Sequence, residues 1–221
     1  MYWTADLESM DKSLTLWLND VITADAVNPA WALITDKHSW WPVYALLFIY
    51  VLWRAGWKKT LIILAAVGLS VLLADRISVA VKLSTERFRP CYDEWMLANG
   101  VDLPIGQGGG KYGFFSGHAA NSFALVTCLI LALRTGGIRK ERVLLWGGFF
   151  WATLMAVSRV ATARHFFGDI FVGAVFGIAV GLLSGYLARW AIRKITYEKD
   201  SNGIGGALDD SGVPQDGQDL Q

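Results

Sequence analysis

Cysteine is scarce in this sequence, and so is charge. Only two of the 221 residues are cysteines, Cys91 in a polar segment and Cys128 inside an apolar block. Two thiols at different depths are too few for a disulfide framework, and we expect both to be unpaired. Charged residues make up 18% of the chain and the formal net charge is +1. This balance favours no class of partner, and no nucleic-acid binding is predicted.

Targeting and repeat signals are also missing. The opening residues, MYWTADLESM, lack the basic and apolar regions of a signal peptide, so none is predicted. We find no internal repeat, and the length is that of a single domain.

Apolar residues dominate the rest of the chain. Hydrophobic residues make up 54% of it, tryptophan occurs 11 times, and the apolar residues gather in blocks. This pattern predicts a membrane protein. Five blocks are candidate spanning helices: 40–53, 60–81, 119–133, 143–160 and 170–192. The first and third are shorter than the roughly 20 residues that cross a bilayer, so they need flanking polar residues in the membrane or a cover of protein.

An amphipathic helix is predicted over residues 6–23. Acidic and polar residues fill one face, and the other face carries Leu7, Met10, Leu14, Trp17, Leu18 and Val21. A helix of this kind lies at a membrane interface or packs on protein, and the sequence favours the first only slightly.

The predicted fold is therefore all-α: a polytopic membrane bundle of about five spanning helices with an N-terminal amphipathic interfacial helix. We divide the chain into an amphipathic segment (1–38), a membrane domain (39–196) and an acidic, glycine-rich tail (197–221) that is predicted to be disordered and cytoplasmic. Within the fifth block a glycine recurs at every fourth position, which predicts close packing against another helix. These glycines are Gly173, Gly177, Gly181 and Gly185.

The basic residues predict the orientation. With five spans, three basic segments fall on one side, which the positive-inside rule makes cytoplasmic. They contain Arg54, Lys58, Lys59, Arg134, Arg139, Lys140, Arg142, Arg189, Arg193, Lys194 and Lys199. The N-terminus and the segments 82–118 and 158–169 then face outward, so we expect a multi-pass inner-membrane protein whose active site faces the periplasm or the outside.

Six cations near span ends depart from this charge bias: Lys82, Arg87, Arg89, Lys111, Arg159 and Arg164. Cations at the edge of a membrane bundle pair with a carboxylate or bind an anion. Contact with lipid headgroups is an equally good interpretation for Arg87, Lys111 and Arg164.

The stretch GGGKYGFFSGH, residues 108–118, suggests phosphate binding but is not a nucleotide loop. A P-loop needs four residues between its two glycines. It also needs Ser or Thr directly after the lysine, whereas Tyr112 follows Lys111 here. Ser116, Gly117 and His118 instead begin an apolar helix, whose free N–H groups and partial positive charge suit a phosphate. Ser116 is equally able to act only as the helix cap.

A second cluster, SRVATARHFFGD, covers residues 158–169. His165 and Asp169 are four residues apart and share a face if the segment is helical. A carboxylate that accepts a hydrogen bond from one imidazole nitrogen leaves the other nitrogen free as a nucleophile. Arg159 is suited to neutralising phosphate oxygens.

Three spaced motifs carry a resemblance to the type 2 phosphatidic acid phosphatases, a family of integral-membrane lipid phosphatases. Lys82, Arg89 and Pro90 match its K-x6-R-P motif, and FSGH at 115–118 matches P-S-G-H except that Phe115 replaces proline. The third motif, S-R-x5-H-x3-D, is matched in full by Ser158, Arg159, His165 and Asp169. The resemblance covers about residues 40–195; members of the family often have six spans, one more than we count.

The resemblance implies a mechanism without a metal or cofactor. His165 would attack phosphorus to form phosphohistidine while Asp169 orients it, and His118 would protonate the leaving oxygen and then activate water. The phosphate would be bound by Lys82, Arg89, Ser116, Gly117 and Arg159.

Several functions are compatible with these residues. An outward-facing site suits undecaprenyl diphosphate, lipid A or phosphatidylglycerophosphate as the substrate, and the sequence predicts no oligomeric state. Vanadium-dependent haloperoxidases share the motifs but are soluble, so the five apolar blocks argue against them. The remaining alternative is a non-catalytic membrane protein that binds or transports lipid headgroups.

Overall fold

The chain forms a bundle of helices in a computed structural model that describes residues 5–134 and 142–205. No strand occurs among these residues, apart from an isolated bridge between Phe88 and Tyr112, so the all-α prediction is confirmed. Short 3-10 turns cover Lys37–Trp40 and Pro90–Tyr92. The helices are α1 (Ala5–Ile22), α2 (Asn28–Thr35), α3 (Trp41–Ala55), α4 (Trp57–Thr85), α5 (Glu94–Ala98), α6 (Gly117–Leu133), α7 (Arg142–Ala161) and α8 (Phe167–Gly205).

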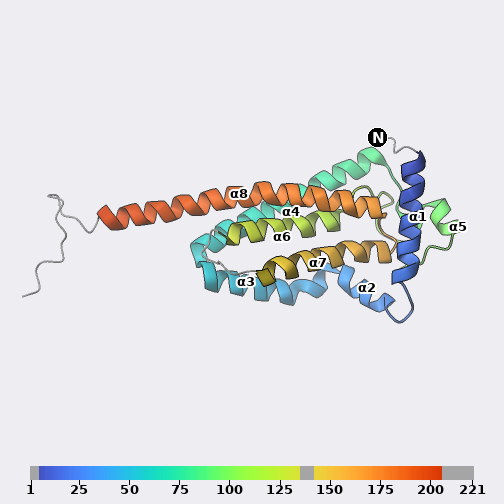
Figure 1. Cartoon of the computed structure of the whole chain (residues 1–221), viewed down its shortest axis with the longest axis horizontal. Helices are drawn as coiled ribbons and strands as arrows, with labels where there is room; N and C mark the ends of the chain where they lie inside the picture. Colours follow the sequence, from blue (N-terminus) through green and yellow to red (C-terminus); the bar gives the residue numbers. More distant parts are fainter. Residues whose placement is uncertain (1–4, 135–141, 206–221) are drawn as a thin grey trace, which may run out of the picture.

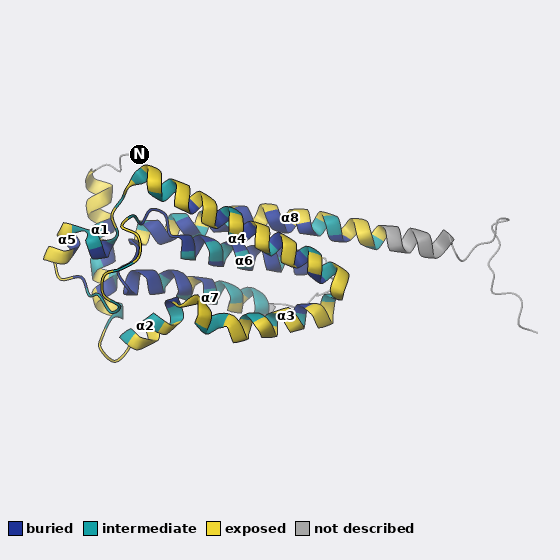
Figure 2. Cartoon of the chain, turned by 180° about the vertical axis from the view of Figure 1, so that it is seen from behind, coloured by how far each residue is buried: buried dark blue, intermediate teal, exposed yellow. Residues whose placement is uncertain are grey.

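Helix α6 lies at the centre of the bundle. It packs on α4, α7 and α8, and most of its side chains are buried, whereas the surrounding helices have exposed outer faces (Figures 1 and 2). Those outer faces carry large apolar side chains, among them Leu46, Phe150, Phe171 and Trp190. Exposed apolar surface of this extent is typical of helices that contact lipid.

Three described helices are long and apolar enough to cross a membrane: Trp57–Thr85, Leu144–Ala161 and Phe167–Tyr197. The other two predicted spans are the two that are short in sequence, α3 with 15 residues and α6 with 17. Protein surrounds α6 on several sides, as its length requires. The first predicted span is preceded by α2 and a 3-10 turn, which continue from α3 toward the end of the bundle where α1 lies (Figure 1).

Helix α1 crosses the end of the bundle instead of running along it (Figure 1). Its polar residues Asp11, Thr15 and Asn19 are buried against the protein, while the apolar side chains of Met10 and Trp17 are 67% and 58% exposed. Packing on protein is therefore confirmed for the polar face, and the position at a membrane interface stays a prediction for the apolar face. The apolar face points outward, as in a helix that lies on a bilayer.

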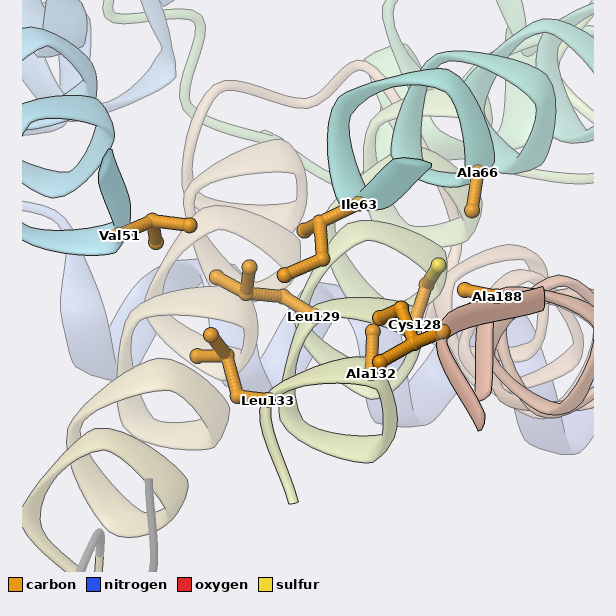
Figure 3. Close-up of a cluster of buried hydrophobic side chains, with 9 residues drawn as sticks. Val51, Ile63, Ala66, Cys128, Leu129, Ala132, Leu133 and Ala188 are labelled. Atoms are coloured by element: carbon orange, nitrogen blue, oxygen red, sulfur yellow. The ribbon is translucent and has the colours of Figure 1, made fainter. Parts of the chain in front are cut away.

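An apolar cluster holds the helices together at the opposite end of the bundle. Figure 3 shows side chains from α3, α4, α6 and α8 converging there. Its members include Val51, Ile63, Leu129, Leu133 and Ile192, all of them buried. The junction of α3 and α4 lies at this end, as do the end of α6 and the start of α7 (Figure 1). The basic residues at these described helix ends, among them Arg54 and Arg134, therefore lie away from α1.

The tail boundary differs from the sequence prediction. Helix α8 continues to Gly205, beyond the predicted boundary at residue 196. The rest of the predicted tail, 206–221, lies outside the described residues, as do Arg139 and Lys140 of the second basic segment. The division of the chain into three segments stays a prediction.

The glycine stripe of α8 packs directly on α6, as its spacing predicts. A Cβ atom added at Gly177 would lie 2.3 Å from the carbonyl oxygen of Ala120, and one at Gly181 would lie 2.6 Å from that of Ala124. These separations are too short for any side chain, so the two backbones approach at a distance that only glycine permits.

We expect Gly177→Ala to destabilise the bundle by about 1–3 kcal/mol, because the added methyl group must push α8 away from the α6 backbone. Gly68→Ala in α4 is the matched control, since a Cβ there meets no atom within 4 Å. Thermal unfolding in detergent should show a lower Tm for the first variant and an equal or higher Tm for the second. Equal Tm values for both variants would contradict this account of the α6–α8 contact.

Candidate active site

Backbone hydrogen bonds join the three sequence motifs at the end of the bundle where α1 lies. The Gly113 N–H donates to the carbonyl of Arg87 (2.8 Å), and the Arg89 N–H donates to that of Lys111 (3.0 Å). The third motif is attached in the same way, because Cys91 N–H donates to Ala163 O (3.1 Å) and Ser116 N–H to Asp169 O (3.0 Å). The glycine-rich stretch is therefore a connector whose backbone hydrogen bonds hold the motifs next to one another.

Both candidate imidazoles line a single cavity of about 540 Å³. Its walls come from α3, α4, α6, α7 and the segments between the helices. Six of the eight predicted site residues lie on these walls: Lys82, Arg89, Gly117, His118, Arg159 and His165. The folded chain thus brings together side chains that are up to 83 positions apart in the sequence, 82 to 165.

Asp169 lies behind His165 and is fully buried. The Nδ1 atom of His165 is 3.3 Å from Oδ2 of Asp169, and the same oxygen accepts a hydrogen bond from the Phe166 N–H at 3.1 Å. Because this contact places the proton on Nδ1, Nε2 carries the lone pair. Helix α8 begins at Phe167, so His165 occupies the preceding turn and Asp169 the first helical turn.

His165 is held in its neutral form. Burial, together with the nearby charges of Arg159 and Arg89, lowers the pKa of this imidazole well below its ordinary value. Lowering the pKa of a histidine extends the neutral form to more acidic pH. A neutral imidazole with a free Nε2 is the form that can act as a nucleophile.

Three cations on the cavity wall have no anionic partner. Within the described residues, Lys82, Arg89 and Arg159 form no ion pair with a carboxylate. Arg89 donates from Nε to the Tyr112 carbonyl (3.2 Å), and Arg159 donates to the Thr35 hydroxyl, while Nε of Arg159 is buried with no hydrogen-bond partner. Cations that gather on a cavity wall without forming an ion pair make a site for an anion.

Ser116 and Gly117 have different positions at the start of α6. Ser116 is fully buried and its hydroxyl accepts a hydrogen bond from the Ala119 N–H at 3.4 Å, which is a helix cap. It is not among the residues that line the cavity, unlike Gly117. A Cβ at Gly117 would lie 2.9 Å from the Ser78 hydroxyl and 3.4 Å from Nζ of Lys82, so glycine allows α4 and its lysine to approach.

Arg87 is an important part of this site that the sequence analysis did not identify. Its Nη1 donates to Asp169 (2.8 Å) and its Nη2 donates to Asp11 of α1 (2.6 Å), and the guanidinium lies 4.2 Å from the centroid of the Phe166 ring. Of the two interpretations of Arg87, pairing with a carboxylate is therefore confirmed and contact with lipid headgroups is wrong. Arg164 is also buried and donates to the Gly108 carbonyl, whereas Lys111 is exposed.

Helix α1 is attached to the same segments through its polar face. Asp11 accepts from the Gly168 N–H (2.8 Å), Thr15 accepts from the Phe167 N–H (2.9 Å), and Asn19 bonds to the carbonyls of Val160 and Ala161 (both 3.2 Å). These polar residues recur every fourth position. That spacing is the signal from which an inward polar stripe could have been predicted.

Comparison with known proteins agrees with this geometry. A model of the PAP2 superfamily matches residues 59–193. The chain is 29% identical to a lipid A 4'-phosphatase of Bacteroides thetaiotaomicron over 89% of this chain and 83% of that protein. It is 32% identical to a lipid A 4'-phosphatase of Porphyromonas gingivalis over 80% and 70%, respectively.

A solved structure shares the fold. The crystal structure of the transmembrane PAP2-type phosphatidylglycerolphosphate phosphatase from Bacillus subtilis superposes with a TM-score of 0.62 at 21% identity, covering 87% of this chain and 89% of that one. The family match spans nearly all of α4, all of α6 and α7, and most of α8, and so includes all three motifs and most of the residues that line the cavity. The chain therefore belongs to the PAP2 superfamily.

Proposed function

We propose that this protein hydrolyses a lipid phosphate monoester of the lipid A type at the extracytoplasmic face, through a phosphohistidine intermediate and without a metal ion. One observation carries the proposal. A single cavity is lined by two imidazoles and by three cations that form no ion pair among the described residues, and one of the imidazoles is oriented by a buried aspartate.

In the first step the phosphate lies among Lys82, Arg89 and Arg159, with the N–H groups at the start of α6 as further donors. Nε2 of His165 attacks phosphorus, forming the N–P bond as the P–O bond to the lipid breaks. His118 gives its proton to the departing oxygen, so the lipid leaves as an alcohol.

In the second step His118, now neutral, takes a proton from a water molecule that attacks phosphorus. The N–P bond breaks, its electron pair returns to Nε2, and inorganic phosphate is released. Asp169 keeps the Nδ1 proton in place throughout and stabilises the positive charge that the ring acquires. Ser116 contributes by capping the helix that presents Gly117 and His118.

The choice of substrate is supported by the names of the two relatives, both lipid A 4'-phosphatases that match most of this chain. Undecaprenyl diphosphate and phosphatidylglycerophosphate are the competing substrates. The extracytoplasmic orientation is supported by the separation of the basic segments around Arg54 and Arg134 from the cavity end of the bundle (Figure 1).

Phosphate release by the full chain in detergent micelles tests the proposal. We expect inorganic phosphate to be released from 4'-phosphorylated lipid A in the presence of EDTA and release to be blocked by vanadate, a mimic of the five-coordinate phosphorus. Undecaprenyl diphosphate and phosphatidylglycerophosphate are assayed in parallel.

Each possible result has a defined meaning. Faster release from one of the competing lipids would change the substrate and keep the chemistry. Release that stops with EDTA and returns with a divalent cation would contradict the metal-free mechanism. Binding of lipid phosphates without any release would favour the non-catalytic alternative.

A further inference from the structure

We propose that the cavity holds a saccharide subsite next to the phosphate site and deeper in the helical bundle. It is formed by Asn121, Trp151 and Asp75. This inference rests on the proposed function and specifies the substrate: the phosphate is attached to a sugar that the protein recognises. The evidence is a set of polar groups on the cavity wall that the mechanism does not use.

Two of these groups are buried without a hydrogen-bond partner. They are Oδ1 of Asn121, an acceptor, and Nε1 of Trp151, a donor. Both residues line the cavity. Buried polar groups that lack a partner are unfavourable, above all between spanning helices, and they are usually satisfied by water or by a ligand.

Asn121 and Asp75 both lie deeper in the helical bundle than the phosphate site. Asn121 follows His118 by three residues on α6 and so lies on the same face, about 4.5 Å further along the helix axis. Asp75 precedes Lys82 by seven residues on α4, two turns further from the cations. A carboxylate in a spanning helix that faces a cavity is expected to have a functional partner.

Trp151 supplies the third wall, from α7. Its ring makes edge contacts with Trp40 (centroids 5.8 Å apart) and Tyr44 (6.1 Å), so the indole is held in one orientation. Tyr44 and Lys37 line the same cavity. The subsite thus offers donors and acceptors on several sides of the cavity, which suits a ring with several hydroxyl groups.

An isoprenoid diphosphate fits this wall poorly. In such a lipid the reacting phosphorus is attached to a second phosphate, and the hydrocarbon chain follows that group. The second phosphate has no hydrogen to donate to Oδ1 of Asn121 and is repelled by the carboxylate of Asp75. A glycerol headgroup offers few hydroxyls for groups that come from three different helices. A sugar phosphate places hydroxyls next to the phosphorus, at the depth where the unpartnered atoms lie.

Substrate preference tests the inference. The measured quantity is the ratio of kcat/KM for 4'-phosphorylated lipid A to kcat/KM for undecaprenyl diphosphate. We expect Asn121→Leu and Trp151→Phe each to lower this ratio at least about tenfold, because each removes one hydrogen-bonding group and keeps most of the volume. Leu125→Met, on the same wall, is the matched control and should leave the ratio within about twofold.

The outcomes separate the subsite from the proposed function. An unchanged ratio in both variants, or equal losses on both lipids, would overturn the saccharide subsite while phosphate release by the wild type stands. A wild type that is active on undecaprenyl diphosphate and inactive on lipid A would overturn it as well. If the wild type releases phosphate from no lipid, the proposed function is contradicted, and so is the subsite that rests on it.

Discussion

Replacing His165 with alanine is expected to reduce phosphate release by at least about 10⁴-fold, because the nucleophile that forms the covalent intermediate is lost. The fold should survive, since the backbone hydrogen bonds donated by Ala163, Arg164 and residue 165 itself do not need the imidazole. Release of inorganic phosphate in micelles measures the loss, and the Tm shows whether the protein remains folded.

The covalent intermediate gives a second measurement on the same residue. In a His118→Ala variant, water activation slows by about 10²–10⁴-fold, so we expect ³²P from a labelled lipid to remain on the protein as an acid-labile phosphohistidine. The His165→Ala/His118→Ala double variant should take up no label. Persistent activity in His165→Ala, or labelling of the double variant, would show that another group attacks the phosphorus.

Replacing Arg87 with alanine is expected to have the second largest effect, a fall in kcat of about 10²-fold. Arg87 links Asp169 to Asp11 of α1, and all three side chains are buried or nearly so. Without the guanidinium the Asp169 carboxylate is left without its charge partner and takes up a proton, so it no longer holds the Nδ1 proton of His165. Losing one partner of a buried pair also destabilises a protein by about 3–5 kcal/mol.

Two measurements distinguish a role of Arg87 in positioning His165 from a general loss of stability in the Arg87→Ala variant. We expect kcat to fall with little change in KM, because Arg87 is not among the residues that line the cavity. The ¹⁵N spectrum of His165 should show a mixture of tautomers in the variant and a single tautomer in the wild type. An equal loss in KM, or an unchanged tautomer, would assign Arg87 a purely structural role.

Two further variants complete this test. Asp11→Asn keeps an oxygen that can accept from the Gly168 N–H but removes the charge opposite Arg87, so a smaller loss of kcat is expected and folding is better preserved. Lys111→Ala removes an exposed cation from the same end of the bundle and should change neither kcat nor the tautomer.

The spanning helices and the motif residues could be predicted from the sequence. Blocks of apolar residues predict helices in a bilayer because neighbouring residues along the chain share one environment, so hydropathy is a local property. The glycine stripe of α8 was equally predictable, since a four-residue spacing places Gly173 to Gly185 on one face whatever that face contacts. Motif spacing likewise indicated six residues that now line one cavity.

Contacts between distant segments required the folded chain. Nothing local to Arg87 shows that its guanidinium turns toward Asp169 and Asp11, 82 and 76 positions away. The outward direction of the apolar face of α1, and the positions of Asn121 and Trp151 on the cavity wall, depend in the same way on which helix packs beside each one. Hydropathy and motif spacing depend only on residues within a few turns of one helix. The direction and the partner of a side chain are instead set by packing between helices that are far apart in sequence.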